Sequence, residues 1–365
     1  MSSNPLLSGV RILDLSRLLP GPFCTLYLAQ MGAEVIKIEE PNGGDYARVL
    51  SPEMFALVNR GKKSVTLDLR QPGDRAKFLQ LVETADVVLE TFRPGVMDRL
   101  GCGYDRLQQI NPRLVFAALT GYGQTGPYRD RAGHDMNYRG YAGELDQTGA
   151  AGGPPAAGNF QVADLAGGAL TCAVGILGAL YGARASGVGS FVDVGMLDGT
   201  LALQVLSIAS VRAVGRSQPR GGDLLSGAMP NYSIYECADG KYLAVGAVEP
   251  KFFHQALRVA GREDLIKQPT APGASPLREE LAALIKTRTR DDWERDLAHL
   301  DTCVSAVLTP AEALENEQVR ARGLIEMVDG KPQIGLPIQF SNATTLSGTS
   351  PKLGADNAAV LGALA

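Results

Sequence analysis

The chain has 365 residues, a length that predicts about two domains, each with a hydrophobic core. Hydrophobic residues make up 45% of the sequence and charged residues 20%, the usual balance of a globular protein. The formal net charge of −4 gives no general attraction to nucleic acid or to anionic lipid. We expect neither partner, and an anionic ligand would need basic residues placed locally.

The five cysteines are widely scattered, with no Cys-x-x-Cys and no Cys/His ligand spacing. This pattern predicts neither a zinc site nor a disulfide framework, and it favours a reducing compartment. The stretch "MSSNPLLSGVRILDLS" lacks the basic start and long apolar core of a signal peptide, and the terminal "GALA" is not the peroxisomal Ser-Lys-Leu signal. We therefore expect a cytoplasmic protein.

The first part of the chain alternates short apolar, β-rich runs with helical patterns. This alternation predicts a parallel α/β sheet wound by helices. The turn after the first run reads "LLPGPF", so the glycine fingerprint of dinucleotide-binding folds is absent and NAD is not supported. The expected strands are 9–16, 33–41, 63–69, 86–92 and 113–123, with helices after the first strand and over 72–85.

Residues 165–183 are nineteen uncharged residues, nearly the length of a membrane span. Five are glycines and no second such segment exists, so we expect a helix buried on most sides rather than membrane contact. Residues 189–203 predict a strand followed by a helix, and 212–231 a linker rich in glycine, arginine and proline.

The last third predicts a smaller α+β unit. Residues 232–248 form two β-rich runs around an Ala-Asp-Gly turn, which is a hairpin signal. Two amphipathic helices follow, and the second carries Trp293, Leu297 and Leu300 on one face. The expected fold is a large Rossmann-like parallel-sheet domain plus a smaller α+β domain. The domain limits are 1–195 for the large domain, 196–230 for a linker, 231–315 for the small domain and 316–365 for a return to the large domain.

His134 and Asp135 lie in "RAGHDMNY", a stretch without helical or strand period between two glycine-rich segments. Loops in such positions often carry function, and a histidine titrates near neutral pH. His134 is therefore a candidate general base. The alternative is a histidine that only makes structural hydrogen bonds.

Asp164 stands directly before the long apolar helix. Asp is a preferred N-cap residue, which alone would explain its position. A helix N-terminus also offers free N–H groups that can stabilise an oxyanion. A carboxylate held there, against Gly167 and Gly168, would be able to approach a substrate closely.

Glu236 lies in the hairpin strand "YSIYECADG", on the face opposite Tyr235 and Cys237 because strands alternate faces. A lone Glu there is more often a solvated residue than a catalytic one. Basic and glycine-rich turns lie at 59–63, 92–95 and 121–127, and several of them follow predicted strands. Ligands of open α/β sheets bind at such ends, and Arg, Lys and free amides there suit phosphates; the alternative is turns with solvated charges.

Five stretches follow one another in order: "GVRILDLSRLLPGPFCTLYLAQMGAEVIKIEEP", "NRGKKSVTLDL", "ADVVLETFRPGVMDRLG", "NPRLVFAALTGYGQTGPY" and "GSFVDVGMLDG". In order and spacing they resemble the family III CoA-transferases across essentially the whole chain. Within that family, "GHDMNY" and "YECADGKYLAVGAVEPKFF" resemble the α-methylacyl-CoA racemase branch, as does the compact length.

The resemblance implies an interlocked homodimer whose subunits each have a large and a small domain. It implies coenzyme A on the large domain, with the thioester between the large domain of one subunit and the small domain of the other. By position, the catalytic histidine falls on His134, the catalytic aspartate on Asp164, and the glutamate that supports the histidine on Glu236.

The implied reaction inverts the α-carbon of a 2-methylacyl-CoA. Removing the α-proton gives a planar enolate, and inversion needs an acid/base group on each face, His134 on one and Asp164 on the other. N–H groups at the start of the Asp164 helix would hold the enolate oxygen. Coenzyme A is part of the substrate, so no metal or further cofactor is required.

The matching coenzyme A positions include two arginines that are the best phosphate partners, Arg93 and Arg99. There is one departure from the family. Many relatives carry a basic residue for the adenosine phosphate at the end of the second strand, where this chain has Glu40. Arg48, Arg60 or Lys62 would then substitute. The remaining matching positions are Leu18, Leu67, Thr91, Phe92 and Tyr122.

Two other functions fit the same residues. In the transferase branch the aspartate that matches Asp164 is a nucleophile that forms an acyl anhydride, and a carboxylate serves either role. The second alternative is a non-catalytic acyl-CoA-binding protein. His134 and Glu236 favour racemisation, and the sequence does not specify the acyl group.

Overall fold

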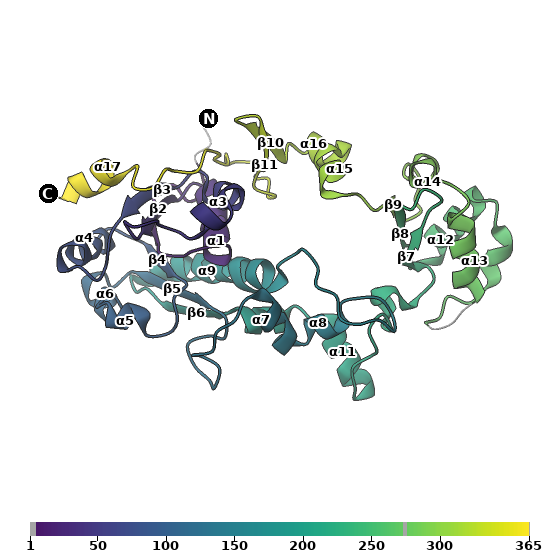
Figure 1. Ribbon diagram of the computed structural model, residues 1–365, viewed down its shortest axis with the longest axis horizontal. Coiled ribbons are helices and arrows are strands. Elements are labelled where there is room, and N and C mark those ends of the chain that lie inside the picture. Colours follow the sequence, from purple (N-terminus) through teal and green to yellow (C-terminus); the bar gives the residue numbers. More distant parts are fainter. Residues whose placement is uncertain (1–4, 273–275, 365) are drawn as a thin grey trace. The chain divides into compact units, whose positions relative to one another are not determined.

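The computed structural model describes residues 5–272 and 276–364. The chain forms two compact units, each built from separate segments (Figure 1). Met1–Glu144, Gly158–Leu203 and Glu317–Ala365 form the first unit; Leu145–Ala157 and Gln204–Asn316 form the second. Whether the limits 195, 230 and 315 bound independently folding domains stays a prediction.

The first unit is built on a six-stranded parallel sheet of strand order β3-β2-β1-β4-β5-β6. The α/β fold class expected from the sequence is therefore confirmed, and each expected strand is present. The central strands are buried on both faces, which is why they appear in the sequence as apolar runs. The strands are β1 (Arg11–Asp14), β2 (Glu34–Glu39), β3 (Lys63–Thr66), β4 (Val87–Glu90), β5 (Val115–Thr120) and β6 (Phe191–Gly195).

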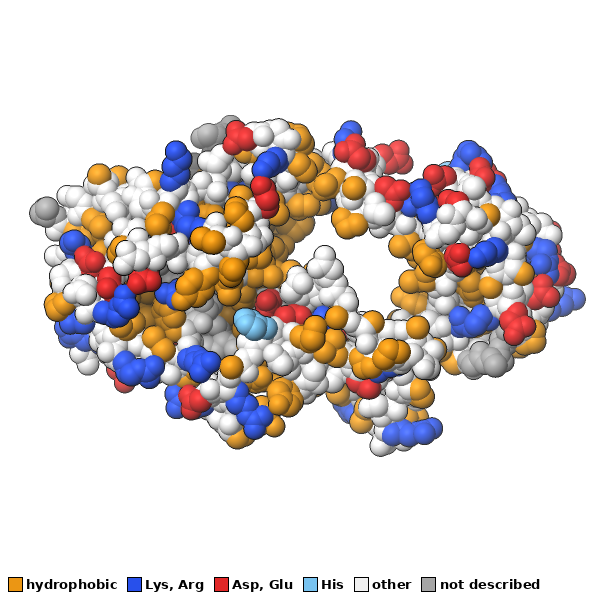
Figure 2. Space-filling view, in the orientation of Figure 1, with side chains coloured by type: hydrophobic (Ala, Val, Ile, Leu, Met, Phe, Trp, Pro, Cys, Tyr) orange, Lys and Arg blue, Asp and Glu red, His pale blue; other side chains and the backbone are white. Residues whose placement is uncertain are grey.

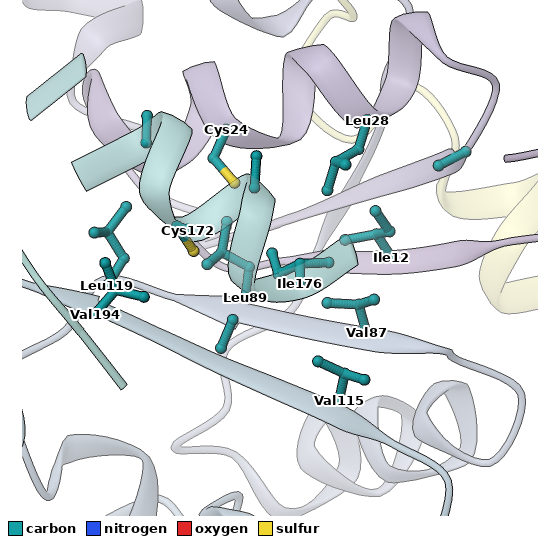
Figure 3. Packing of buried hydrophobic residues seen from close by; sticks show 14 of the residues in the cluster. Ile12, Cys24, Leu28, Val87, Leu89, Val115, Leu119, Cys172, Ile176 and Val194 are labelled. Carbon is teal, nitrogen blue, oxygen red and sulfur yellow. The ribbon is translucent and has the colours of Figure 1, made fainter. Parts of the chain in front are cut away.

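Helices cover both faces of this sheet (Figure 1). Because side chains alternate along a strand, Ile12 and Leu89 join one core, and Leu13 and Val88 the other. The first core lies beneath α1 (Pro20–Gln30), η1 (Ala163–Leu170) and α9 (Thr171–Ser186), where Cys24 lies close to Cys172 (Figure 3). The second lies beneath α4 (Pro72–Val82) and α6 (Tyr104–Ile110).

The first unit contains further short elements, several of which sequence patterns did not indicate. They are α2 (Ala47–Leu50), α3 (Pro52–Asn59), α5 (Val96–Arg99), α7 (Asp135–Ala142), α10 (Met196–Ala202), α16 (Glu317–Ala321), the hairpin β10 (Ile325–Val328) and β11 (Lys331–Ile334), α17 (Asn357–Leu361) and η4 (Gly362–Leu364). A further short helix, α8 (Glu144–Gln147), begins at the end of the unit's first segment.

The apolar stretch that η1 and α9 form is only partly buried. Within the described residues, Ala163–Ser186 is long and apolar enough to cross a membrane, with a mean hydropathy of 1.6. The bent pair of α10 with α11 (Val205–Val214) would pass the same test if counted as one span. Ile176 is fully buried, but Val174 is 71% and Tyr181 80% exposed. The expectation of a helix buried on most sides is therefore wrong for the single chain.

The second unit contains the antiparallel sheet β7 (Tyr232–Glu236), β8 (Tyr242–Gly246) and β9 (Val304–Ala306), which confirms the predicted hairpin. Trp293 and Leu297 of α14 (Arg290–Leu297) are buried in its core, as the sequence indicates. The expected linker 212–231 is not wholly irregular, because it contains the end of α11 (Val205–Val214) and η2 (Leu224–Ala228). The other helices are α12 (Pro250–Val259), η3 (Glu263–Lys267), α13 (Pro276–Ile285) and α15 (Pro310–Glu315).

A buried charge network lies at the end of β1. The Lys62 ammonium is 3.2 Å from Asp14 Oδ2, and both side chains are fully buried. Lys62 Nζ also donates to the carbonyls of Pro22 and of the Asn59 side chain. Burial favours a higher pKa for Asp14, but Lys62 and a second buried lysine, Lys37, lower it to about 2. Both charges are therefore kept and compensated inside the protein.

Candidate active site

A cavity of about 640 Å³ opens at the carboxyl ends of the strands of the first unit. It is lined by the turns that follow β1, β4 and β5, including Leu18, Phe92 and Tyr122. Since β1 and β4 are neighbours, the chain winds away in opposite directions from this point, and open α/β sheets bind ligands at such a switch. On the face drawn in Figure 2, a histidine side chain lies beside acidic and hydrophobic side chains.

The turn after β1 is held in a strained conformation. Leu18 has a φ of 63°, a region that non-glycine residues rarely adopt. Its N–H donates to Asp45 Oδ1 at 2.9 Å, and Asp45 Oδ2 lies 2.9 Å from the buried Lys37 ammonium. These two contacts hold the strained turn in place, and the turn forms one wall of the cavity. Backbone strain of this kind is typical of ligand sites.

The turn after β4 supplies Thr91, Phe92 and Arg93 to the same cavity. Beneath it, the buried Glu90 carboxyl accepts the Phe92 N–H at 2.6 Å. Burial raises the pKa of Glu90 to about 8. At neutral pH this side chain is therefore mostly protonated, and it holds the turn without placing a full negative charge beneath it.

His134 is the N-cap residue of α7 and lies on the cavity wall. Its backbone N–H donates to the Asn137 side chain at 3.0 Å, which starts the helix. One turn later, Tyr138 Oη donates to the Gly133 carbonyl at 2.5 Å. A Cβ on Gly133 would lie 2.7 Å from the Tyr138 ring, so the glycine allows this close packing. The imidazole is thereby presented from a fixed backbone.

Asp164 also lines the cavity, as the second residue of η1. The expected N-cap role of Asp164 is wrong, because η1 is a π-helix that begins at Ala163 and has Val162 in the cap position. The capping carboxylate is instead that of Asp135, whose Oδ1 accepts the N–H groups of Ala163 and Asp164 at 2.8 and 3.2 Å. The Asp164 carboxyl therefore does not cap η1, and π-helical segments inside helices are frequent at functional sites.

Because Asp135 caps η1, two expectations about this helix are corrected. The N–H groups at its start bind Asp135 rather than an oxyanion. The glycines next in the helix do not open toward a ligand, because a Cβ on Gly167 would meet Thr200 Oγ1 at 2.5 Å and one on Gly168 would meet Met196 at 2.8 Å. They allow η1 to pack closely against α10 instead.

The environment of Asp164 suits proton transfer. Burial raises the pKa of this carboxyl, and the neighbouring Asp135 carboxylate raises it further, to about 7. A general acid or base is most effective when its pKa lies near the working pH. Asp164 therefore populates both its protonated and its ionised form at neutral pH.

Most of the predicted site residues line this one cavity: His134, Asp164, Leu18, Thr91, Phe92, Arg93 and Tyr122. Leu67 and Arg99 are not among the lining residues. Leu67 is buried in the sheet core, and Arg99 is exposed on α5. Glu236 belongs to the second unit, where its carboxylate is exposed and pairs with Lys286 at 2.8 Å.

The three residues named as substitutes for a phosphate ligand are held by other groups. The Arg48 guanidinium pairs with Glu39 at 2.7 Å, and Lys62 is buried against Asp14. Arg60 is buried and donates to the backbone carbonyls of Leu57 and Ile334. Glu40, the departure from the family pattern, pairs with Arg70 at 2.6 Å.

Sequence reasoning missed the residues that support the cavity. Tyr138, Asp45 and Arg17 each hold or line its walls. The Arg17 guanidinium lies over the rings of Tyr46 and Phe92 at about 5 Å. Arg17 could have been identified from its position directly after the first predicted strand, because ligand-binding turns follow the strands of such sheets.

The chain is similar to known proteins along most of its length. A model of CoA-transferase family III matches residues 7–357. The alpha-methylacyl-CoA racemase of Homo sapiens is 36% identical over 319 residues, covering 87% of this chain and 81% of the human protein. The acetyl-CoA:oxalate CoA-transferase of Acetobacter aceti is 34% identical over 347 residues, covering 91% of this chain and 88% of that protein.

Solved structures agree with this similarity. A CAIB/BAIF family protein from Brucella suis superposes with a TM-score of 0.89 at 31% sequence identity, covering 99% of this chain and 100% of that one. Racemases and transferases are thus both close relatives, so the reaction must be argued from the site.

Proposed function

Because the chain belongs to CoA-transferase family III, we propose that it is a racemase that inverts the α-carbon of 2-methylacyl-CoA thioesters. The proposal rests on one observation above all: His134 and Asp164 line the same cavity. An imidazole and a carboxyl that titrates near pH 7 are the pair that two-sided proton transfer needs.

In the proposed reaction, the α-proton leaves as a proton to one of these groups, and its electron pair moves into the thioester to form the enolate. The opposite group then delivers a proton to the other face, which restores the thioester with the α-carbon inverted. For one enantiomer His134 accepts the proton and Asp164 donates one, and for the other the roles exchange. No metal or separate cofactor takes part in these steps.

The enolate oxygen needs hydrogen-bond donors, and we assign them to α7. In the described part of the chain, neither the N–H of Asp135 nor that of Met136, in the first turn of α7, donates a hydrogen bond. The N-terminus of a helix carries partial positive charge that stabilises an anion. In this proposal the start of α7 takes the role of oxyanion donor that the sequence predicted for the start of η1. The N–H groups of η1 donate to Asp135 instead.

The quaternary structure and location are part of the same proposal. The exposed side of α9 carries Val174 and Tyr181, and α11 exposes Val205 and Leu206. These apolar side chains support an interlocked homodimer in which Glu236 of the partner subunit orients His134. The free cysteines, four of them buried, suit a reducing, cytoplasmic compartment.

Arg93 is proposed to bind a phosphate of coenzyme A, since it lines the cavity next to Phe92. Replacing Arg93 with Ala is expected to raise the Kd for coenzyme A by about tenfold or more, because a charge-assisted phosphate contact contributes roughly 1.5–3 kcal/mol. Isothermal titration calorimetry measures the change.

Arg106→Ala is the matched control for that measurement, because Arg106 is exposed on α6 and does not line the cavity. We expect its Kd to stay within about twofold of the parent chain. Arg99→Ala tests the other predicted phosphate partner: a loss of affinity in that variant and not in Arg93→Ala would move the phosphate site to α5.

Deuterium exchange tests the reaction. Each enantiomer of a 2-methylacyl-CoA is incubated with the protein in deuterated water, and the product is examined by mass spectrometry and chiral chromatography. A racemase incorporates α-deuterium and produces the same mixture from either enantiomer.

The second candidate is a CoA-transferase, which the similarity to the oxalate enzyme favours. There Asp164 would attack the thioester carbonyl, form an acyl anhydride and release CoA thiolate. Transfer of CoA to an added carboxylic acid without α-deuterium uptake supports this candidate. Binding without either reaction would contradict both.

A further inference from the structure

Asp135 joins the two helices that carry the proposed acid/base groups. It is the first residue of α7 and follows His134 directly, while its Oδ1 accepts the N–H groups of Ala163 and Asp164. One carboxylate oxygen thus connects the N-terminus of α7 to the N-terminus of η1.

Asp135 is itself fixed from the next turn of α7. Arg139 Nη1 lies 3.4 Å from Asp135 Oδ2, and the Arg139 side chain is almost wholly buried. Arg139 Nε in turn donates to Glu144 Oε2 at 2.6 Å. A carboxylate held by a buried, anchored guanidinium has little freedom to turn away from η1.

Asp135 also places a negative charge beside Asp164. Among the titratable groups on the elements packed against η1 in the described structure, it is the one whose charge raises the pKa of Asp164. These groups are Asp135, Tyr138, Arg139 and Tyr141 on α7, Asp198 on α10, Asp193 on β6, Cys24 and Tyr27 on α1, and Cys172, Tyr181 and Arg184 on α9.

We propose that Asp135 is a positioning residue that fixes the spacing of His134 and Asp164 and keeps a negative charge beside the Asp164 carboxyl. It does not touch the reacting atoms through its side chain, which is directed at the start of η1. The inference rests on the proposed function, in which Asp164 both accepts and donates a proton.

Two variants separate the two parts of this role. Asn at position 135 keeps an oxygen that accepts both N–H groups but removes the charge, whereas Ala removes both. In Asp135→Asn the titration of Asp164 shifts to lower pH, because a nearby like charge no longer disfavours ionisation. We expect the acidic limb of the pH–rate profile for α-deuterium exchange to move down by roughly 0.5–1 pH unit.

In Asp135→Ala we expect kcat to fall by about 10²-fold with KM changed little, since misplaced reacting groups lower the rate more than binding. Asp130→Asn is the matched control, because Asp130 is an exposed aspartate of the same loop. Its profile should match that of the parent chain. If Asp135 were only structural, both Asp135 variants would lower Tm and activity and leave the pH profile in place.

A measurement without substrate separates this inference from the proposed function. The pH dependence of carbodiimide labelling of Asp164, followed by peptide mass spectrometry, reports its ionisation in the free protein. A lower midpoint in Asp135→Asn supports the inference even if the parent chain exchanges no α-proton, a result that would refute only the racemase. An unchanged midpoint in a folded Asp135→Asn protein overturns the inference.

Discussion

Replacing Asp164 with Asn is expected to slow racemisation strongly while leaving α-deuterium exchange for one enantiomer only. The reason is the two-sided site: His134 can still remove the proton on its own face and return deuterium to that face without inversion. His134→Gln should show the reverse preference. Overall racemisation should fall by roughly 10²–10⁴-fold in each variant, measured by chiral chromatography with mass spectrometry.

Each variant is the control for the other, because each keeps one of the two acid/base groups. Both replacements are close in size to the original side chain. Unchanged Tm and unchanged affinity for coenzyme A show that the fold is kept. Loss of exchange for both enantiomers in both variants would contradict independent roles on opposite faces. If Asp164→Asn abolished CoA transfer while His134→Gln retained it, Asp164 would be a nucleophile instead.

Lys62→Met is expected to destabilise the first unit by about 3–5 kcal/mol, because it leaves the fully buried Asp14 carboxylate without its partner. Urea denaturation at pH 7 measures this change. Asp14 has a pKa of about 2 in the folded chain, so its stabilising effect is present above its unfolded pKa of 3.8 and is lost as the pH falls toward 2. The difference in unfolding free energy between Lys62→Met and the parent chain should therefore be smaller in acid than at pH 7.

The neighbouring Lys63 provides the matched control. Its ammonium pairs with Glu34 at 2.6 Å, but its side chain is 45% exposed, so Lys63→Met should cost less than about 1 kcal/mol. Asp14→Asn combined with Lys62→Met should lose less stability than Lys62→Met alone, since no buried charge remains unpaired. A double variant as unstable as the sum of the single ones would show that the pair is not coupled.

The sheet could be predicted from the sequence because its strands are buried and short turns separate them from helices. β4 and β5 appear as the apolar runs "VVLE" and "VFAALT". The hairpin of β7 and β8 could be predicted from the Ala-Asp-Gly turn between the two strands. Helices α2 and α3 were missed, since contacts distant in sequence help to hold them. Arg48 of α2 donates to the backbone carbonyl of Pro351 at 3.1 Å, 303 residues further along the chain, and it also pairs with Glu39 of β2.

At the site, His134 and Asp164 could be named from residue type, loop context and family resemblance, and both line the cavity. The cap of η1 could not be predicted, because the capping carboxylate comes from Asp135, 28 residues before Ala163. Local patterns describe neighbours along the chain, so Asp164 itself was the nearest candidate for the cap. The raised pKa of Asp164 could not be predicted either, since it depends on burial and on the charge of the same Asp135.

The order in which the two units take up the chain has a consequence for biosynthesis. The polypeptide leaves the first unit after Glu144, returns at Gly158, leaves again after Leu203 and returns at Glu317. The first unit therefore cannot be completed before its last segment has been translated, because α17 packs against β3 only after its residues emerge. All six strands of the sheet emerge long before this segment, so the face of β3 that α17 covers is exposed during synthesis, and transiently exposed apolar surface favours aggregation.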